Sequence, residues 1–448
     1  MPNAPTSYQN LTLCVPRRST FDSSISPSAG HSSSGGSPEH LSRPVVVSSS
    51  IQGDIPHNHV LLKVDRFGFS ANNVTYGMLG EDPHFLYFEF HQAPKTASTS
   101  PSTHGVIPVW GFATVVLSSH KDISVGERVF GYLGMSRYLL LPVEERVNKY
   151  NFYVPRTHLP EDRRPYNQIT RCQADPLYNA IKEDETMIYR PLFWTSFWCE
   201  DWLHATGAIK SSTHVLISSA SAKTAYCLAF VLGLRRINGK VALPTGTAWS
   251  RGGEESTGPP RIVGLTSKRN LKFTKSLGLY DEVLTYDDVE RLGNKGAGAN
   301  TKWVYVDVAG NESLNGRVAT ALGTRIIKGV SLGMSDPSGK IAKADSQPKG
   351  NELEMFFMPE WLIVRRRELS TQSITKMQFD AWDALLRTSH AWMKIERIWW
   401  DGAKSWMGEV KGVVEVYEEC VRGEIGPDRG IVMSLWEQGP AEVVSSRL

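Results

Sequence analysis

THVLISSASAKTAYCLAFVLGL, residues 213–234, is the stretch that decides the fold of this chain. It opens with an apolar run, breaks into small residues from Ser218, and continues with apolar residues at helical spacing from Ala225. This pattern is typical of a parallel strand that turns into a crossover helix. Small residues at such a turn let a ligand approach the backbone, and the unpaired N–H groups of the new helix attract phosphate.

A second strand follows after that helix and an insert. RIVGLTSKRN (residues 261–270) begins with an apolar run and ends in Thr266, Ser267, Lys268 and Arg269. In a dinucleotide-binding fold this strand ends beside the adenosine ribose, where a carboxylate suits NAD and cations suit the 2′-phosphate of NADP. The stretch holds two cations and no carboxylate, so it favours NADPH. The alternative is that both cations are simply solvated.

The turn itself lacks the G-x-G-x-x-G fingerprint. Where its glycines would fall, the chain has Ser219, Ala222, Lys223 and Ala225. Two interpretations remain open. In the first, Lys223 and Thr224 contact phosphate, with Ser219 and Ser221 lining the turn. In the second, the turn has closed and Lys223 is a solvated residue in the first turn of a helix.

The bulk composition excludes several classes of protein. A net charge of +3 is too small to indicate a nucleic-acid partner. Five scattered cysteines without a C-x-x-C pair predict neither a disulfide framework nor a cysteine zinc site, and favour a reducing compartment. The sequence shows no secretory signal and no apolar run long enough for a membrane span, so we expect a cytoplasmic protein.

Composition and periodicity divide the chain into four parts. Residues 1–50 are rich in Ser, Pro and Gly, which predicts a disordered tail. Residues 51–190 read as short strands separated by turns. Residues 191–345 alternate strands and helices, which predicts an α/β domain with a parallel sheet covered on both faces. Residues 346–448 end in a helix, with Gly423 as its C-cap, and a closing strand.

This order of elements resembles the medium-chain dehydrogenase/reductase superfamily, and most closely a divergent branch of its zinc-independent, quinone-reductase-like members. The resemblance implies a Rossmann-type parallel-sheet domain and an N-terminal GroES-like, mostly-β domain that the C-terminal segment completes. The segments that carry it are VLLKVDRFGFSANNVTY (60–76), GERVFGYLGMSRYLLLP (126–142), VLISSASAKTA (215–225), TSKRNLKFTKSLGLYDEVLTYDD (266–288), VYVDVAGN (304–311) and RIIKGVS (325–331).

The resemblance also implies the chemistry. Ser70 and Ala71 stand where zinc-dependent members carry a cysteine and a histidine, so no catalytic zinc is expected. Zinc-free members transfer hydride from the nicotinamide to an activated alkene or quinone, while polar groups surround the developing enolate. A small-molecule substrate and a homodimer built on the nucleotide domain are implied as well.

Individual positions can be carried over from the resemblance. Asn73 and Tyr76 would lie near the nicotinamide, with Tyr76 as a proton donor or an oxyanion hydrogen bond; alternatively Tyr76 packs at an interface and Asn73 caps its loop. Thr195 would lie near the nicotinamide too, although its aromatic-rich stretch (191–207) reads more simply as a buried helix. Other positions expected to line the cofactor are Tyr286, Asp307, Ala309, Gly310, Gly329 and Ser331.

Three functions remain open. The favoured one is an NADPH-dependent, zinc-independent reductase of an activated alkene, quinone or ketone, in secondary metabolism. The first alternative is a non-redox member of the same fold that has lost dinucleotide binding. The second is a non-enzymatic protein that binds a partner through its tryptophan-rich C-terminal part, which includes Trp399, Trp400 and Trp406.

Overall fold

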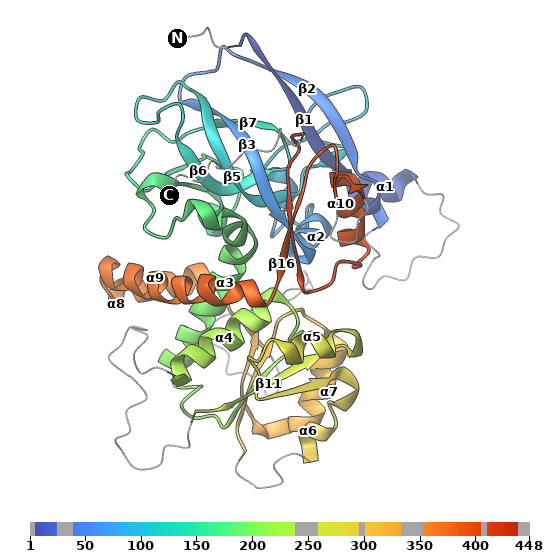
Figure 1. Ribbon diagram of the computed structural model, residues 1–448, viewed down its shortest axis with the longest axis vertical. Helices are drawn as coiled ribbons and strands as arrows, with labels where there is room; N and C mark the ends of the chain where they lie inside the picture. Colours follow the sequence, from blue (N-terminus) through green and yellow to red (C-terminus); the bar gives the residue numbers. More distant parts are fainter. Residues whose placement is uncertain are drawn as a thin grey trace. The chain divides into compact units, whose positions relative to one another are not determined.

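A computed structural model describes residues 5–24, 39–237, 259–294, 301–332, 353–404 and 410–437 of the chain (Figure 1). The chain divides into two compact units. Unit 1 comprises Met1–Ile188 and Lys394–Leu448, and unit 2 comprises Tyr189–Met393. The boundary falls within one long helix, α3 (Glu183–Ala205).

Unit 2 is built on a six-stranded parallel sheet in the order β12-β11-β10-β13-β14-β15. Counted along the chain, this order is 3-2-1-4-5-6, which is the strand order of dinucleotide-binding Rossmann domains. The predicted α/β fold with a parallel sheet is therefore confirmed. The strands are β10 (His214–Ile217), β11 (Arg261–Thr266), β12 (Glu282–Thr285), β13 (Trp303–Asp307), β14 (Ile326–Ser331) and β15 (Glu354–Met355).

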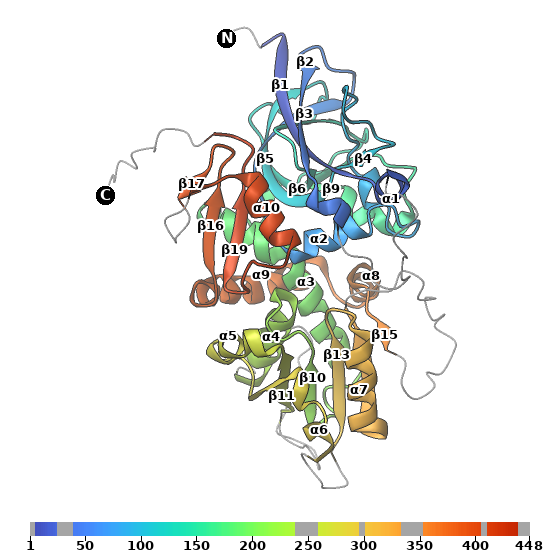
Figure 2. The same ribbon diagram turned by 90° about the vertical axis from the view of Figure 1, so that its right-hand side faces the viewer.

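Helices cover both faces of this sheet. Figure 2 shows α4 (Lys223–Ile237) and α5 (Leu271–Ser276) on one side and α7 (Glu312–Leu322) on the other. Strand side chains such as Leu216 and Val263 pack with Val318 of α7 in a fully buried core. The short helix α6 (Arg291–Asn294) precedes β13.

Two further helices, α8 (Met358–Glu368) and α9 (Thr371–Thr388), also belong to unit 2. The prediction that the chain leaves the nucleotide domain at residue 346 is therefore wrong, since the return begins at Lys394. The physical reason is the amphipathic face of α9: the ring of Trp382 lies 5.5 Å from that of Phe193 and 5.8 Å from that of Trp194. The aromatic stretch of α3 is thus largely helix core.

Unit 1 is built on an eight-stranded sheet in which β19 pairs antiparallel with β3. The C-terminal strand therefore lies beside the first long strand of the same unit, as the resemblance implied. The sheet follows the order β16-β19-β3-β5-β6-β9-β8, and β7 pairs with β3. The strands are β3 (His59–Phe69), β5 (Pro108–Ser118), β6 (Arg128–Gly134), β7 (Tyr138–Pro142), β8 (Asn151–Tyr153), β9 (Gln168–Arg171), β16 (Lys394–Ile398) and β19 (Arg429–Met433).

The predicted disordered tail over residues 1–50 is wrong for much of that segment. There, β1 (Ser7–Pro16) pairs antiparallel with β2 (Val45–Gln52) and with β4 (His104–Gly105), and α1 (Arg18–Ser24) follows β1. Leu13 is fully buried. The average composition of the segment concealed two strands with alternating buried and exposed residues.

The helices of unit 1 include α2 (Ala71–Met78) and α10 (Val413–Val421). After α10, the N–H group of Gly423 donates to the carbonyl of Cys420 at 3.1 Å, with a φ of +69°. The predicted glycine C-cap is confirmed. A small hairpin, β17 (Ala403–Lys404) with β18 (Val410–Lys411), precedes α10. None of the described helices combines the length and the hydropathy that a membrane crossing requires.

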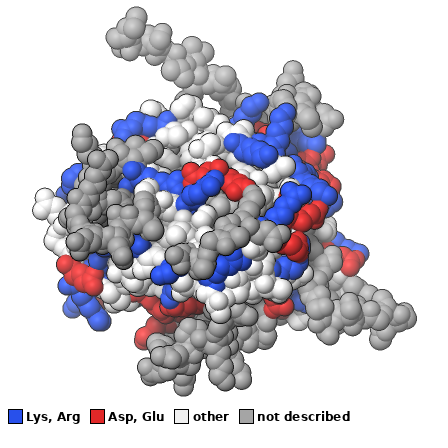
Figure 3. All heavy atoms as spheres, turned by 90° about the horizontal axis from the view of Figure 1, so that it is seen from below, with Lys and Arg blue, Asp and Glu red and all other residues white. Residues whose placement is uncertain are grey.

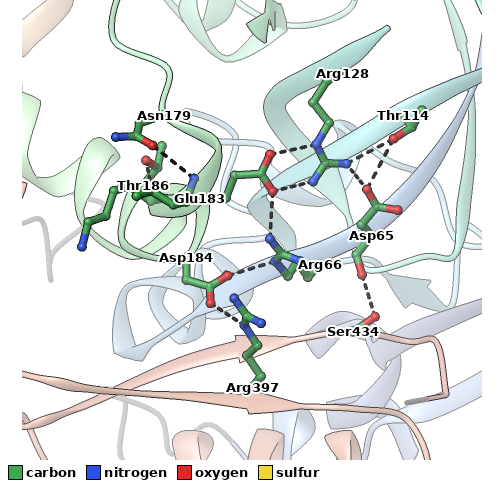
Figure 4. Close-up of polar contacts among 12 residues, drawn as sticks. Asp65, Arg66, Thr114, Arg128, Asn179, Glu183, Asp184, Thr186, Arg397 and Ser434 are labelled. Carbon is green, nitrogen blue, oxygen red and sulfur yellow. Dashed lines mark hydrogen bonds and ion pairs between the residues drawn. The ribbon is translucent and has the colours of Figure 1, made fainter. Parts of the chain in front are cut away.

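A charged network in unit 1 fixes the first turn of α3 (Figure 4). Arg66 Nη2 lies 2.9 Å from Glu183 Oε2, and Arg66 Nε lies 2.9 Å from Asp184 Oδ1. Arg128 contacts both oxygens of Glu183, Oε1 at 2.9 Å and Oε2 at 2.6 Å, and Arg397 Nε lies 2.5 Å from Asp184 Oδ2. Both carboxylates also suit the positive end of the helix dipole. Because every carboxylate in the network has a cation, its role is structural.

Candidate functional site

The first part of the site is the turn between β10 and α4. Ser219 has a φ of +49°, in the left-handed region that side chains rarely adopt. The N–H group of Ala222 donates to the Ser219 carbonyl at 2.7 Å, and that of Ala220 donates to Leu265 at 2.8 Å. This tight turn leads into α4, which begins at Lys223. The first N–H groups of a helix have no intrahelical acceptor, so the turn ends in an anion-attracting helix start.

Side chains from two neighbouring loops converge on this turn. The hydroxyls of Ser219 and Tyr286 lie 3.3 Å apart, and Asn270 Nδ2 donates to Ser221 Oγ at 3.0 Å. The Tyr280 hydroxyl donates to the Ala220 carbonyl at 2.8 Å. The structure thus brings together three predicted positions, at 219, 221 and 286. Sequence reasoning missed Asn270 and Tyr280, because nothing in their local pattern marks a partner in a distant turn.

Gly264 of β11 lets the strand approach the turn closely. A Cβ atom at this position would lie 2.8 Å from Ala220 Cβ and 2.9 Å from Tyr280 Cδ1. Only glycine fits without displacing the turn, since carbon atoms prefer separations of about 3.5–4.0 Å. The close packing of helix and strand that a fingerprint glycine normally permits is supplied here by a glycine in the neighbouring strand.

Asp307 joins β13 to the turn. Its Oδ1 accepts hydrogen bonds from Ser218 Oγ at 2.8 Å and from the Gly310 N–H group at 3.2 Å. Its Oδ2 accepts one from Asn315 Nδ2 at 2.9 Å. Asp307 is 1% exposed, so its geometry assigns it to fixing the turn. β10 and β13 are the strands between which the sheet order reverses, and ligands bind at that point in open α/β sheets.

The remaining predicted cofactor positions lie at the same carboxyl edge of the sheet. Thr266 ends β11 and is fully buried, with the Thr274 hydroxyl 3.4 Å from its own. Ser331 ends β14, and its carbonyl accepts the N–H group of Phe356 at 3.0 Å. Gly329 lies two residues earlier in β14. Thr224 is half-buried in the first turn of α4.

A carboxylate competes with a 2′-phosphate for Lys268, one of the two cations expected to bind that phosphate. Lys268 Nζ lies 2.6 Å from Asp287 Oδ2, and both side chains are largely exposed. The hydrogen bond that Lys268 donates to Asp287 raises the pKa of Lys268. A carboxylate thus lies beside Lys268, although the stretch that carries Lys268 holds none, because Asp287 comes from the loop after β12. Arg269 is exposed beside it, and Ser267 precedes the pair.

In unit 1, Asn73 serves the backbone of its own helix. The N–H group of Ser70 donates to Asn73 Oδ1 at 2.9 Å, and Asn73 Nδ2 donates to the Pro108 carbonyl at 3.2 Å. Both polar ends of this buried amide are occupied. This supports the capping role that the sequence left open, and we exclude Asn73 from the catalytic groups.

Tyr76 lies in a buried aromatic cluster. Its hydroxyl accepts a hydrogen bond from Asn72 Nδ2 at 2.7 Å. Its ring lies 4.5 Å from that of Tyr87 and 5.7 Å from that of Tyr132. Burial raises the pKa of the Tyr76 phenol well above its usual range, and hydrogen bonding by Asn72, Trp110 and Tyr132 acts in the opposite direction. Its proton is thus held tightly, beside groups that would stabilise the phenolate.

Thr195 lies in α3, and its hydroxyl donates to the Pro191 carbonyl one turn earlier at 3.3 Å. This hydrogen bond lies within α3 and does not support a contact between Thr195 and a ligand. Trp399 and Trp400 belong to unit 1, and Trp406 lies outside the described residues. A role of these tryptophans in binding a partner stays a prediction.

The family to which the chain belongs follows from a match over residues 67–425 to the family described as "Protein of unknown function (DUF2855)". The chain is a member of this family. No curated protein matches the sequence.

Solved structures show the fold of this DUF2855 protein. A putative NADPH:quinone reductase from Mesorhizobium loti superposes with a TM-score of 0.50 at 11% identity, covering 96% of this chain and 99% of that one. A mutant enoyl thioester reductase from Candida tropicalis has a TM-score of 0.49 at 14% identity, covering 95% and 100%. The Mesorhizobium loti structure shares the predicted fold, a Rossmann-type parallel-sheet domain with a mostly-β domain.

The chemistry of other surfaces adds little to the site. Among the described residues, no group of three or more His, Cys, Asp or Glu side chains could hold a metal ion. The five cysteines are all buried. Figure 3 shows basic and acidic side chains interspersed on one face of the molecule. The expected absence of zinc and of a nucleic-acid partner stays a prediction.

Proposed function

We propose that this protein is an NADPH-dependent, zinc-independent reductase of an activated alkene, quinone or ketone. The observation that carries the proposal is the 3-2-1-4-5-6 sheet, whose first strand ends in the left-handed turn at Ser219 and the start of α4. That arrangement suits a pyrophosphate at the helix N-terminus. The fold shared with a structure described as a putative NADPH:quinone reductase supports it.

The residues present fit a dinucleotide. The N–H groups at the start of α4, with Lys223 and Thr224, would hold the pyrophosphate, and Gly264 keeps the turn close to β11. Arg269 and Lys268 would hold the 2′-phosphate. The bound cofactor would supply a hydride. In unit 1, Tyr76 would deliver the proton. The neutral hydrogen-bond donors beside its hydroxyl favour the anion that remains after the proton has left.

The test is a fluorescence titration with NADPH. We expect micromolar binding that weakens strongly in Arg269→Ala, with Arg422→Ala as the matched control because Arg422 pairs with Glu424 on an exposed surface. Asp287→Asn should tighten NADPH binding without affecting NADH, because it frees Lys268 for the 2′-phosphate. An absence of binding at millimolar NADPH would overturn the proposal and favour the non-redox alternative.

The finer expectations are part of the same proposal. A homodimer and a role in secondary metabolism rest on the sequence resemblance, and a cytoplasmic location rests on the composition of the chain. Among them, the homodimer is the easiest to test, by measuring the mass of the protein in solution.

A further inference from the structure

The cluster around Tyr76 contains two buried hydrogen-bond donors that have no acceptor. Trp110 and Tyr132 face each other as a cross-strand pair of β5 and β6, with ring centroids 5.1 Å apart. Within the described chain, neither Trp110 Nε1 nor Tyr132 Oη makes a hydrogen bond of normal geometry, although both atoms are buried. A buried donor without a partner is costly, typically by about 1–3 kcal/mol. Two such donors in one cluster call for an acceptor.

The Tyr76 oxygen is the acceptor that links these donors, since hydrogen bonding by Trp110 and by Tyr132 lowers the pKa of Tyr76 against the effect of burial. The ring of Tyr76 lies 5.7 Å from that of Tyr132 in an edge-on arrangement, and Asn72 Nδ2 already donates to the Tyr76 hydroxyl. A neutral phenol oxygen that also donates its own proton has little capacity for three donors. A phenolate accepts all three. A phenolate at Tyr76 would therefore satisfy donors that the cluster leaves without a partner of normal geometry.

A buried cation lies in the same cluster. The Arg156 guanidinium donates to the Phe90 carbonyl and to Asn167 Oδ1, both at 3.0 Å, and its third contact is His91 at 3.5 Å. All three partners are uncharged when His91 is neutral. Arg156 thus forms no ion pair within the described residues. The ring of Phe90 links it to the cluster, since Arg156 lies over that ring at 5.3 Å and Tyr132 lies 5.1 Å from it.

We propose that Asn72, Trp110 and Tyr132 are positioning residues that stabilise the phenolate of Tyr76 after it has donated its proton. This inference rests on the proposed function. Bound NADPH would supply a hydride to one carbon of a C=C bond conjugated to a carbonyl, and Tyr76 would give its O–H proton to the resulting enolate. Tyr76 is left as a phenolate, which regains a proton from water.

The titratable and charged groups around Tyr76 come from several elements. Tyr132 lies on β6 and Tyr87 on the short helix that follows α2, and the segment Glu161–Asn167 contributes Tyr166 with Arg163 and Asp162. Of the nearby cations, Arg163 lowers the pKa of Tyr87 and of Tyr132, and Arg156 interacts with Tyr132. Arg163 is already paired with Asp162. Removal of a neutral donor should therefore change the pKa of Tyr76 more than removal of a charged group.

The test replaces Tyr76 with a fluorinated tyrosine whose free phenol ionises near neutral pH, and follows its ionisation by absorbance. Tyr132→Phe and Trp110→Phe should each raise the pKa of that phenol by about one unit, because each removes one hydrogen bond to a charged acceptor. Tyr153→Phe is the matched control, since its hydroxyl donates to Gln168 Oε1 at 3.1 Å outside the cluster; no shift is expected.

Thermal melting and near-ultraviolet circular dichroism check that each variant is folded. An unchanged pKa in both Tyr132→Phe and Trp110→Phe would overturn the inference, as would loss of folding in both, which would assign the pair to packing alone. The readout needs neither NADPH nor a substrate. Failure of NADPH binding would therefore overturn the proposed function, whereas the pKa measurement tests the role of Trp110 and Tyr132 separately.

Discussion

Gly264→Ala tests whether the nucleotide turn depends on contact with β11. The added Cβ would lie 2.8 Å from Ala220 Cβ, about 1 Å short of a comfortable carbon–carbon separation. Ala220 cannot move alone, because its N–H group donates to Leu265 and its carbonyl accepts from Tyr280. Overpacking of this kind costs about 1–3 kcal/mol, and we expect the upper half of that range.

Two measurements report the effect. Urea unfolding should show a lower midpoint with an unchanged slope, and thermal melting should fall by about 2–4 °C for each kcal/mol lost. If the displaced turn weakens pyrophosphate binding by about 1.4 kcal/mol, NADPH affinity falls about tenfold. Gly316→Ala is the control: this exposed glycine lies inside α7 with nothing within 4 Å of an added Cβ, so alanine should stabilise by about 0.5–1 kcal/mol. Equal stability and equal NADPH affinity in Gly264→Ala and the parent would refute the reasoning.

Three other substitutions probe the rest of the fold. Arg235→Ala leaves the fully buried carboxylate of Glu200 without its cation and should cost about 3–5 kcal/mol in denaturant unfolding, whereas exposed Arg422→Ala should cost at most about 0.5; equal effects would contradict this. Burial lowers the pKa of His91 from 6.5 to about 3. The contribution of neutral His91 to folding stability is therefore fully present above pH 6.5 and is lost as the pH falls toward 3. His91→Gln should flatten that decline, and an unchanged acid slope would count against it. Gly423→Ala forces a side chain into a φ of +69° and should lower stability by about 1–2 kcal/mol, with Gly423→Asn milder.

The parallel sheet was predictable because the five longer of its strands each carry a signal of their own. Apolar runs at Val215, Ile262 and Val304 lie between polar turns, and a buried parallel strand needs no alternation. The carboxyl ends of those strands must share one edge, so the cofactor residues could be placed together. Strand β15 escaped notice, because two residues carry no periodicity.

What the sequence could not reveal depends on long-range pairing. Lys268 and Asp287 come from different loops and meet only when β11 and β12 lie side by side. Trp110 and Tyr132 become neighbours only through the register of β5 with β6. Neither contact can be predicted from the spacing of residues within one segment. The lack of a hydrogen-bond acceptor is a property of the assembled cluster, which no single segment contains.

The pairing of β3 with β19 matters for anyone who wishes to express a shorter version of this protein. The family match spans residues 67–425, so a gene cut at those limits would begin near the end of β3 (His59–Phe69) and stop before β19 (Arg429–Met433). It would also lack β1, whose Leu13 is fully buried. Such a fragment would expose unpaired strand edges and should aggregate. Truncation limits outside Ser7 and Trp436 would keep every strand of unit 1 paired with its neighbours.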